Sequence, residues 1–354
     1  MRIALITDPL RRNYPEAIQR AYHRSLHHVV ENIALAIKGL GHAFKHFEAN
    51  HHLQNAIEKF NPHIVFNRSN RTICDHDGAS TPKLLDQLEI PYTGPNANNC
   101  VIAFNKAKTK SILIKRGLRT ANFVTFSDPE EVFHPENLTF PLIVKPIQGG
   151  CSVGIEWDNL IFTNEALKRV CASLITDFNQ PVIVESFING REFTVGILGN
   201  EQPKVLPILE FIYQSEEAYH FRSFKTKMNV GKYEKKSCPA ALSREEKREI
   251  INLAVRTYQA IGCRDYARID MRFDKDHLPY VLEVNAFPSL ISGGSSFAYM
   301  AEVGGLNFAA MIQRILGFAM KRHQAKNTSI VPILSPKTLG KNITQTRPPS
   351  PIPR

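Results

Sequence analysis

The chain has 354 residues, of which 43% are hydrophobic and 22% are charged. This length and composition exclude a wholly disordered chain, a collagen-like fibre and a small disulfide-stapled domain, and they suit two or three packed lobes. No acidic residue follows Glu302, whereas eight basic residues do, so most of the net charge of +11 lies in the C-terminal segment. We therefore expect a nearly neutral folded body and no nucleic-acid partner.

The sequence contains no apolar run of the roughly 18 residues that span a bilayer. The first apolar segment, Ile3–Ile6, is interrupted at once by Asp8 and Pro9. A buried first strand explains it better than a signal peptide does. We expect a cytoplasmic protein without membrane partners.

The N-terminal part alternates short apolar runs with helical stretches. Strands are predicted at 3–6, 43–47 and 63–66, and helices at about 15–40 and 81–88. This order predicts a small parallel sheet covered by helices. The turn cluster Pro91–Pro95 then marks a boundary, so residues 1–93 are expected to form an N-terminal α/β lobe.

The following segments continue the mixture of helices and strands expected of an α/β protein. Helices are predicted at about 98–116, 164–178 and 243–261, with a terminal helix ending near 323, and strands at 123–126, 140–144, 181–185, 192–198, 205–211, 266–273 and 280–285. An irregular polar stretch covers about 215–238. We expect a central lobe at 94–179, a C-terminal lobe at 180–323 and a disordered, basic, proline-rich tail at 324–354.

A phosphate-binding pattern follows the predicted strand at 140–144. Lys145 comes directly after that strand, and the glycine-rich segment Gly149–Gly154 comes soon after it. A lysine beside free backbone N–H groups favours phosphate oxygens, because glycine lets the backbone approach closely. A surface lysine followed by a mobile hairpin would give the same pattern. Neither a P-loop nor a Gly-x-Gly-x-x-Gly motif is present.

Two segments with period-two alternation flank the short polar loop Asp274–His277 and predict an antiparallel hairpin. If Phe273 faces Leu278, Arg268 lies opposite Glu283 and Asp270 lies opposite Val281. Four polar side chains then share one sheet face: Arg268, Asp270, Glu283 and Asn285. Their carboxylate and amide oxygens suit Mg²⁺. The alternative is a solvated polar face with a cross-strand Arg–Glu pair.

Two further carboxylates lie at strand ends. Glu185 ends one predicted strand and Glu192 begins the next. Such groups could accept hydrogen bonds from an adenine amino group and from ribose hydroxyls. Taken singly, each is also explained as an ordinary charge at a strand end.

At these residues the sequence resembles the ATP-grasp superfamily and, within it, the D-alanine–D-alanine ligase group. The resemblance covers nearly the whole body, and the segments that carry it follow the family's order: Pro91–Gly94 with Lys106, Val144–Pro146 with the glycine-rich loop, Val184-Glu185, Gly190–Gly196, Cys238–Ala240, Ala267–Asp270 and Leu282–Asn285. It implies a three-lobed architecture with ATP between the central and C-terminal lobes.

The resemblance implies a ligase that joins two amino acids, or amino-acid-like substrates, through an acyl phosphate. ATP would act with two Mg²⁺ ions, for which Mn²⁺ is a conceivable substitute. Lys106 and Lys145 would hold phosphates, Glu185 the adenine and Glu192 the ribose. The other implied nucleotide-binding positions are Gly150, Ser152, Ile188 and Phe221, and the implied metal ligands are Asp270, Glu283 and Asn285. The implied catalytic positions are Arg268, which would stabilise an oxyanion, Lys227, which would reach the transferred phosphate, and Ser296.

Departures from the family cluster at the first-substrate positions. No glutamate stands after the first strand, Asn67 replaces a histidine, Cys151 replaces a serine, and a loop tyrosine falls near Met228. Ser289 replaces a glycine whose N–H helps the oxyanion hole, although serine still has an N–H. We expect the reaction class to survive with a different substrate pair. A nucleotide-binding sensor or partner subunit without ligase activity is the alternative, and a homodimer stays open.

Overall fold

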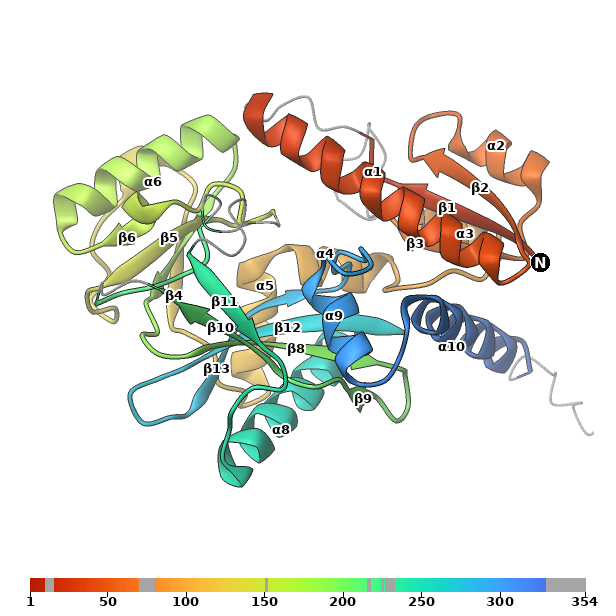
Figure 1. Cartoon of the computed structure of the whole chain (residues 1–354). Coiled ribbons are helices and arrows are strands. Elements are labelled where there is room, and N and C mark those ends of the chain that lie inside the picture. The colour runs from red at the N-terminus through yellow and green to blue at the C-terminus, as the bar shows by residue number, and fades with distance from the viewer. Residues whose placement is uncertain are drawn as a thin grey trace, which may run out of the picture.

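The structure is a computed structural model of the whole chain. It describes residues 1–9, 16–69, 80–149, 152–214, 218–223, 226 and 233–328. Three sheets organise these residues, and each sheet has helices packed against it (Figure 1). The predicted site positions Gly150 and Lys227 lie outside the described residues, as do Cys151 and Met228.

The N-terminal sheet is parallel, with strand order β2-β1-β3. Its elements are β1 (Arg2–Thr7), α1 (Glu16–Gly39), β2 (Ala43–Glu48), α2 (Leu53–Phe60), β3 (Ile64–Arg68) and α3 (Ser80–Gln87). Alternate residues of β1 point to opposite faces. Ile3 and Leu5 pack on α1 and on the last helix, whereas Ala4 and Ile6 pack with residues of α2 and α3. The predicted parallel α/β arrangement is confirmed.

A four-stranded antiparallel sheet follows, with strand order β4-β7-β5-β6. Its elements are β4 (Phe123–Phe126), β5 (Leu142–Pro146), β6 (Leu160–Ile161), α6 (Asn164–Phe178) and β7 (Val182–Ser186). Leu142, Val144, Val182 and Val184 face α6 in one apolar core. The opposite face of β5 and β7 therefore carries Ile143, Lys145 and Glu185.

The C-terminal sheet has six strands in the order β11-β10-β8-β12-β13, and β9 pairs with β8. Its elements are β8 (Glu192–Leu198), β9 (Lys204–Val205), β10 (Leu209–Tyr213), β11 (Glu234–Ser237), α8 (Arg244–Ile261), β12 (Tyr266–Phe273) and β13 (Pro279–Asn285). Helix α8 begins at a capping box, in which Ser243 and Glu246 satisfy each other's backbone N–H groups. Its apolar side covers one sheet face, which is formed by residues such as Val195, Ile269 and Met271.

Four predicted elements differ from the structure. The helix expected over 98–116 is two helices, α4 (Ala97–Phe104) and α5 (Lys106–Lys115), because Asn105 is extended and its side chain caps α5. The strand expected over 205–211 is interrupted around Pro207, which lacks the N–H that a ladder needs. The stretch expected to be irregular contains β11. Helices α9 (Ser296–Val303) and α10 (Phe308–Thr328) end the described chain, so helix continues beyond residue 323.

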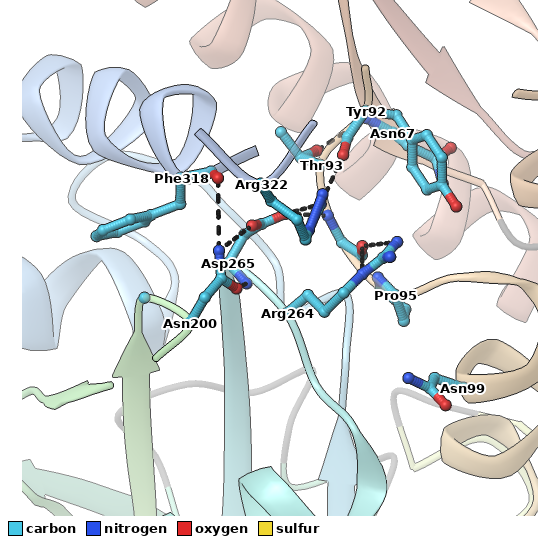
Figure 2. A network of polar contacts seen from close by, with 12 residues as sticks. Asn67, Tyr92, Thr93, Pro95, Asn99, Asn200, Arg264, Asp265, Phe318 and Arg322 are labelled. Atoms are coloured by element: carbon cyan, nitrogen blue, oxygen red, sulfur yellow. Dashed lines mark hydrogen bonds and ion pairs between the residues drawn. The ribbon is translucent and has the colours of Figure 1, made fainter. Parts of the chain in front are cut away.

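The buried Asp265 carboxylate connects three segments that are distant in the sequence (Figure 2). Arg322 of α10 donates hydrogen bonds to the Asp265 carboxylate at 2.7 Å and to the Tyr92 carbonyl at 2.9 Å. The same carboxylate accepts from the Gly94 N–H at 2.8 Å and from the Asn200 amide at 3.0 Å. Asp265 thus ties the segment after the N-terminal sheet to α10 and to the C-terminal sheet.

Within the described residues, no helix taken alone has both the length and the apolar character to cross a bilayer. Only α9 and α10 together, bent by 101° at their junction, meet that criterion of length and composition.

Candidate active site

A cleft with about 740 Å³ of open space lies between the four-stranded sheet and the C-terminal sheet. It gathers ten of the predicted site residues: Lys106, Lys145, Ser152, Glu185, Ile188, Glu192, Phe221, Arg268, Asp270 and Glu283. Asn285 lines an adjoining cavity that also includes Lys106 and Glu283. Ser296, the first residue of α9, lines neither of these two cavities.

Strand alternation explains why polar groups from distant segments meet here. In β5 and β7 every second side chain packs on α6, so Lys145 and Glu185 point the other way, into the cleft. In β8 and β12 the apolar set packs on α8, which leaves Glu192 and Asp270 on the cleft face. Two sheets thus turn their polar faces toward one space.

The hairpin of β12 and β13 has the predicted face but not the predicted register. Arg268 pairs with Asn285 and Asp270 pairs with Glu283, while Phe273 pairs with Pro279 rather than Leu278. The register changes between Asp270 and Met271, where a β-bulge adds one extra residue to β13. If the pairing near Phe273 continued without this bulge, Glu283 and Asn285 would point toward α8. The bulge instead places both side chains on the same face as Asp270.

Arg268 holds the Asp270 carboxylate with two hydrogen bonds. Its Nε lies 2.8 Å from Oδ1 and its Nη2 lies 2.6 Å from Oδ2, and Thr194 donates to Oδ1 at 2.5 Å. Burial would raise the pKa of Asp270, but Arg268 outweighs burial and lowers this pKa to about 2. The Arg268 and Asp270 side chains are only 9% and 15% exposed, so these two residues do not form the solvated face of the alternative interpretation. The cross-strand Arg268–Glu283 pair is nevertheless present, at 3.8 Å.

Glu185 lies fully buried between two lysines on the other side of the cleft. Its Oε2 is 3.0 Å from the Lys145 Nζ and 3.4 Å from the Lys110 Nζ. Burial would raise the pKa of Glu185, but these ammonium groups outweigh it and lower that pKa. Burial lowers the pKa of Lys110 to about 8. The Glu185 Oε1 has no hydrogen-bond partner among the described residues, so it can accept a hydrogen bond from a ligand.

Lys106 differs from the other cleft lysine in its partners. Its Nζ donates to the Pro146 carbonyl at 3.1 Å, and within the described chain it forms no ion pair. Burial lowers the pKa of Lys106, and Lys145 adds to that effect. A half-buried ammonium that has no ion pair within the described chain favours an anionic ligand.

Two arginines of the cleft were not identified from the sequence. Arg272 donates to Glu192 at 2.5 Å and to the Ile188 carbonyl at 3.1 Å, and Arg222 forms a two-point pair with Glu234. The alternation of β12 was the signal for Arg272, since it follows Arg268 and Asp270 on the same face. Arg222 had no such signal, because it lies in the stretch expected to be irregular.

The donor set for a divalent ion consists of two carboxylates and one amide. No group of three or more His, Cys, Asp or Glu side chains with metal-site geometry occurs within the described ranges. Asp270 is ionised at neutral pH, and each carboxylate oxygen has more than one lone pair, so its bonds to Arg268 leave acceptor capacity. The Asn285 Oδ1 accepts the Phe287 N–H at 3.0 Å and keeps a second lone pair. This set fits Mg²⁺, which prefers hard oxygen ligands.

Residues 112–317 match the family described as "D-ala D-ala ligase C-terminus". The chain belongs to the D-alanine–D-alanine ligase family. A D-alanine–D-alanine ligase of Carboxydothermus hydrogenoformans is 31% identical over 249 residues, which cover 68% of this chain and 77% of the relative. An uncharacterized protein of Sinorhizobium fredii, y4sG, is 28% identical over 303 residues and covers 83% of this chain and 88% of its own length.

Solved members of the D-alanine–D-alanine ligase family share the fold. The ligase of Bacillus anthracis, solved in complex with ATP, has a TM-score of 0.73 and 21% identity, and the match covers 92% of this chain and 99% of that one. The ligase of Coxiella burnetii has a TM-score of 0.69 and 18% identity, with 93% and 97% covered. The predicted ATP-grasp architecture and the interpretation as an ATP-dependent carbon–nitrogen ligase are confirmed at the level of the family.

Proposed function

We propose that this protein uses ATP to join the carboxylate of one amino-acid-like substrate to the amine of another. The observation that carries the proposal is the convergence of Lys106, Lys145 and Glu185 with Arg268 and Asp270 around one cleft. ATP would phosphorylate the first carboxylate, giving an acyl phosphate and ADP. The amine of the second substrate would then attack the acyl carbon, and phosphate would leave.

The nucleotide's groups match the charges of the cleft. The phosphates would lie against Lys106 and Lys145, whose ammonium groups neutralise charge during phosphoryl transfer. The free Glu185 Oε1 would accept a hydrogen bond from the adenine amino group. Glu192, held by Tyr213 at 2.6 Å and by Arg272, would accept hydrogen bonds from ribose hydroxyls.

Asp270, Glu283 and Asn285 would hold Mg²⁺, which supplies further neutralisation of the transferred phosphoryl group. Arg268 lies beside them and would stabilise the oxyanion that forms when the amine attacks. Its hold on Asp270 orients both side chains before any ligand arrives. Lys227 and Gly150 remain predicted participants, and Ser296 is proposed to act on the substrate side through the N-terminal end of α9.

The substrate pair need not be two D-alanines. Asn67 stands where the family has a histidine, and it is fully buried, with its side-chain Nδ2 unpaired among the described residues. An amide at this position cannot supply a titratable ring. We therefore propose a small amino-acid or natural-product carboxylate as the first substrate. We also propose a cytoplasmic location and no nucleic-acid or membrane partner.

A ligation assay across D- and L-amino acids tests this function. Phosphate release is measured for single substrates and for pairs, beginning with D-alanine, and the product is identified by mass. Release stimulated by one pair, together with a product equal in mass to that pair minus water, supports the proposal. ATP binding without turnover for any pair would instead favour the sensor or partner-subunit function.

A further inference from the structure

Lys236 of β11 lies on the same face of the C-terminal sheet as the polar residues of the cleft. It pairs with Phe211 of β10, and Phe211 pairs with Glu192 of β8. Residues that pair directly across antiparallel strands carry their side chains on the same face. Glu192 lines the cleft, so the Lys236 side chain also belongs to the cleft face of the sheet.

Two observations place Lys236 beside residues that line the cleft. The Arg222 Cζ lies 3.8 Å from the centroid of the Phe211 ring, which is the cross-strand neighbour of Lys236. Burial lowers the pKa of Lys236, Arg222 lowers it further, Glu234 opposes this effect and Arg268 adds to it. Charges in about 0.1 M salt act on each other over roughly 10 Å. Lys236 is therefore close to Arg222 and Arg268, and both of these arginines line the cleft.

The charge of Lys236 is not balanced in the way that the neighbouring charges are. The arginines that line the cleft each pair with a carboxylate at 2.5–2.8 Å: Arg222 with Glu234, Arg268 with Asp270 and Arg272 with Glu192. The Lys236 side chain forms neither an ion pair nor a hydrogen bond with any residue that the structure describes. Its three ammonium donors are thus available to a ligand.

Two structural roles of unpaired cations do not explain Lys236. Arg264 also has no ion pair within the described ranges, but its donors bind the Gly94 carbonyl at 2.8 and 3.0 Å, so it ties two segments together. Lysines on edge strands prevent pairing with another chain. Lys235 fits that role, because it is exposed on the opposite face of β11, beside the exposed Ile212. Lys236 makes no such tie and is half-buried.

We infer that Lys236 is a specificity-determining residue, and that its ammonium group binds a side-chain carboxylate carried by one of the two substrates. The inference rests on the proposed function and narrows its substrate class to pairs that include an acidic amino acid. A partly desolvated ammonium and a carboxylate form a strong, charge-assisted hydrogen bond. The phosphates of ATP have other cations, since Lys106 and Lys145 line the cleft from α5 and β5.

The experiment compares acidic substrates with their neutral amides in the full-length protein. Phosphate release and product mass are measured for aspartate against asparagine and for glutamate against glutamine, in D and L forms and in either position of the pair. We expect the wild type to prefer an acidic member. Lys236→Met should lower kcat/KM for that acid by about 10-fold to 100-fold, as expected for one charge-assisted hydrogen bond. The value of kcat/KM for the amide and the KM for ATP should change by less than about twofold.

Lys235→Met is the matched control. It removes the same charge from the adjacent residue of the same edge strand, but from the exposed face. This variant should keep the preference for the acid. Lys236→Arg should keep most of that preference, because it retains a cation with N–H donors. Thermal unfolding should show that Lys236→Met is as stable as the wild type, since the lost charge has no partner within the described chain.

Three results would overturn the inference. One is a wild type that does not distinguish the acids from their amides. Another is an equal loss for acid and amide in Lys236→Met, which would indicate a general structural effect. The third is a higher KM for ATP with an unchanged preference for the acid, which would assign Lys236 to a phosphate. If the wild type ligates neutral pairs only, the inference fails and the proposed function stands; if it ligates no pair, both fail.

Discussion

Trp157 and Phe221 pack against each other beside the cleft, with ring centroids 4.9 Å apart. Trp157 precedes β6 of the four-stranded sheet, whereas Phe221 follows β10 of the C-terminal sheet and lines the cleft. The chain contains no other tryptophan. The indole is therefore a single optical reporter placed where the two sheets approach each other.

Nucleotide binding should change the fluorescence of Trp157. A ligand that contacts Phe221 alters the surroundings of the indole, so ATP should produce a saturable change in emission. Lys106→Met should shift the same titration to higher ATP concentration, because it removes the unpaired ammonium. Emission that stays constant while equilibrium dialysis shows bound ATP would contradict this placement of the nucleotide.

Asp270→Asn should abolish Mg²⁺-dependent turnover, with a loss of more than about 100-fold. The substitution removes a charged oxygen ligand and the nearer of the two carboxylates that pair with Arg268. Circular dichroism should still report a folded protein, and Glu283→Gln should behave similarly. Thr194→Val is the milder comparison, because it removes only the 2.5 Å bond to Oδ1. Near-wild-type rates in Asp270→Asn would refute the metal assignment.

Lys110→Met should destabilise the protein by about 1–3 kcal/mol, because Glu185 loses one of its two ammonium partners and keeps Lys145 at 3.0 Å. Lys110 and Glu185 are each 1% exposed, so water cannot replace the lost charge. Urea unfolding measures the change. The double variant Lys110→Met, Glu185→Gln should be less destabilised than the sum of the two single variants. Simple additivity would show that the two charges do not interact.

Nucleotide affinity should weaken above about pH 8. A lysine with a lowered pKa is charged below that pKa and neutral above it, and the pKa of Lys110 is about 8. The pKa of Lys106 is lowered in the same direction. Lys106 lines the cleft and Lys110 lies behind Glu185, so each lost proton removes positive charge from the wall of the site. Titrations between pH 6.5 and 9.5 should show the fall, and Lys106→Arg should make it shallower; constant affinity across this range is the contrary result.

Asp265→Ala should destabilise the protein more than Asp265→Asn does. Alanine removes the acceptor of the Gly94 N–H and the carboxylate partner of Arg322, which keeps its bond to the Tyr92 carbonyl, whereas asparagine keeps an oxygen there. Asparagine also tolerates the positive φ of 66° at this position. Thermal unfolding of the two variants measures the difference, and equal midpoints would mean that the buried network contributes little.

Most of the helices and strands, and the polar face of the β12–β13 hairpin, could be predicted from the sequence. Alternation alone put Asp270 and Glu283 on one side of the hairpin, and the ends of predicted strands identified Lys145 and Glu185 as separate site candidates. Capping signals at Ser243 located the start of α8. These features are local, so they can be recognised in a single sequence.

Features that depend on contacts between distant segments could not be predicted. Nothing near Lys110 indicates that Glu185 would be its partner, and nothing near Arg68 indicates that it would donate to the carbonyl of Pro288. The break at Asn105 is also tertiary in part, since that residue forms a bridge to Gln148. The prediction of the hairpin register was wrong because a bulge has no reliable sequence signal.

That bulge restricts how the length of the chain can vary. Gain of one codon between Val281 and Glu283 would move Glu283 and Asn285 one position along the strand and turn both oxygen donors into the apolar layer that packs on α8. The tip at Asp274–His277, by contrast, can gain or lose residues with little effect on either strand. Insertions among related genes should therefore collect at the tip and spare β13.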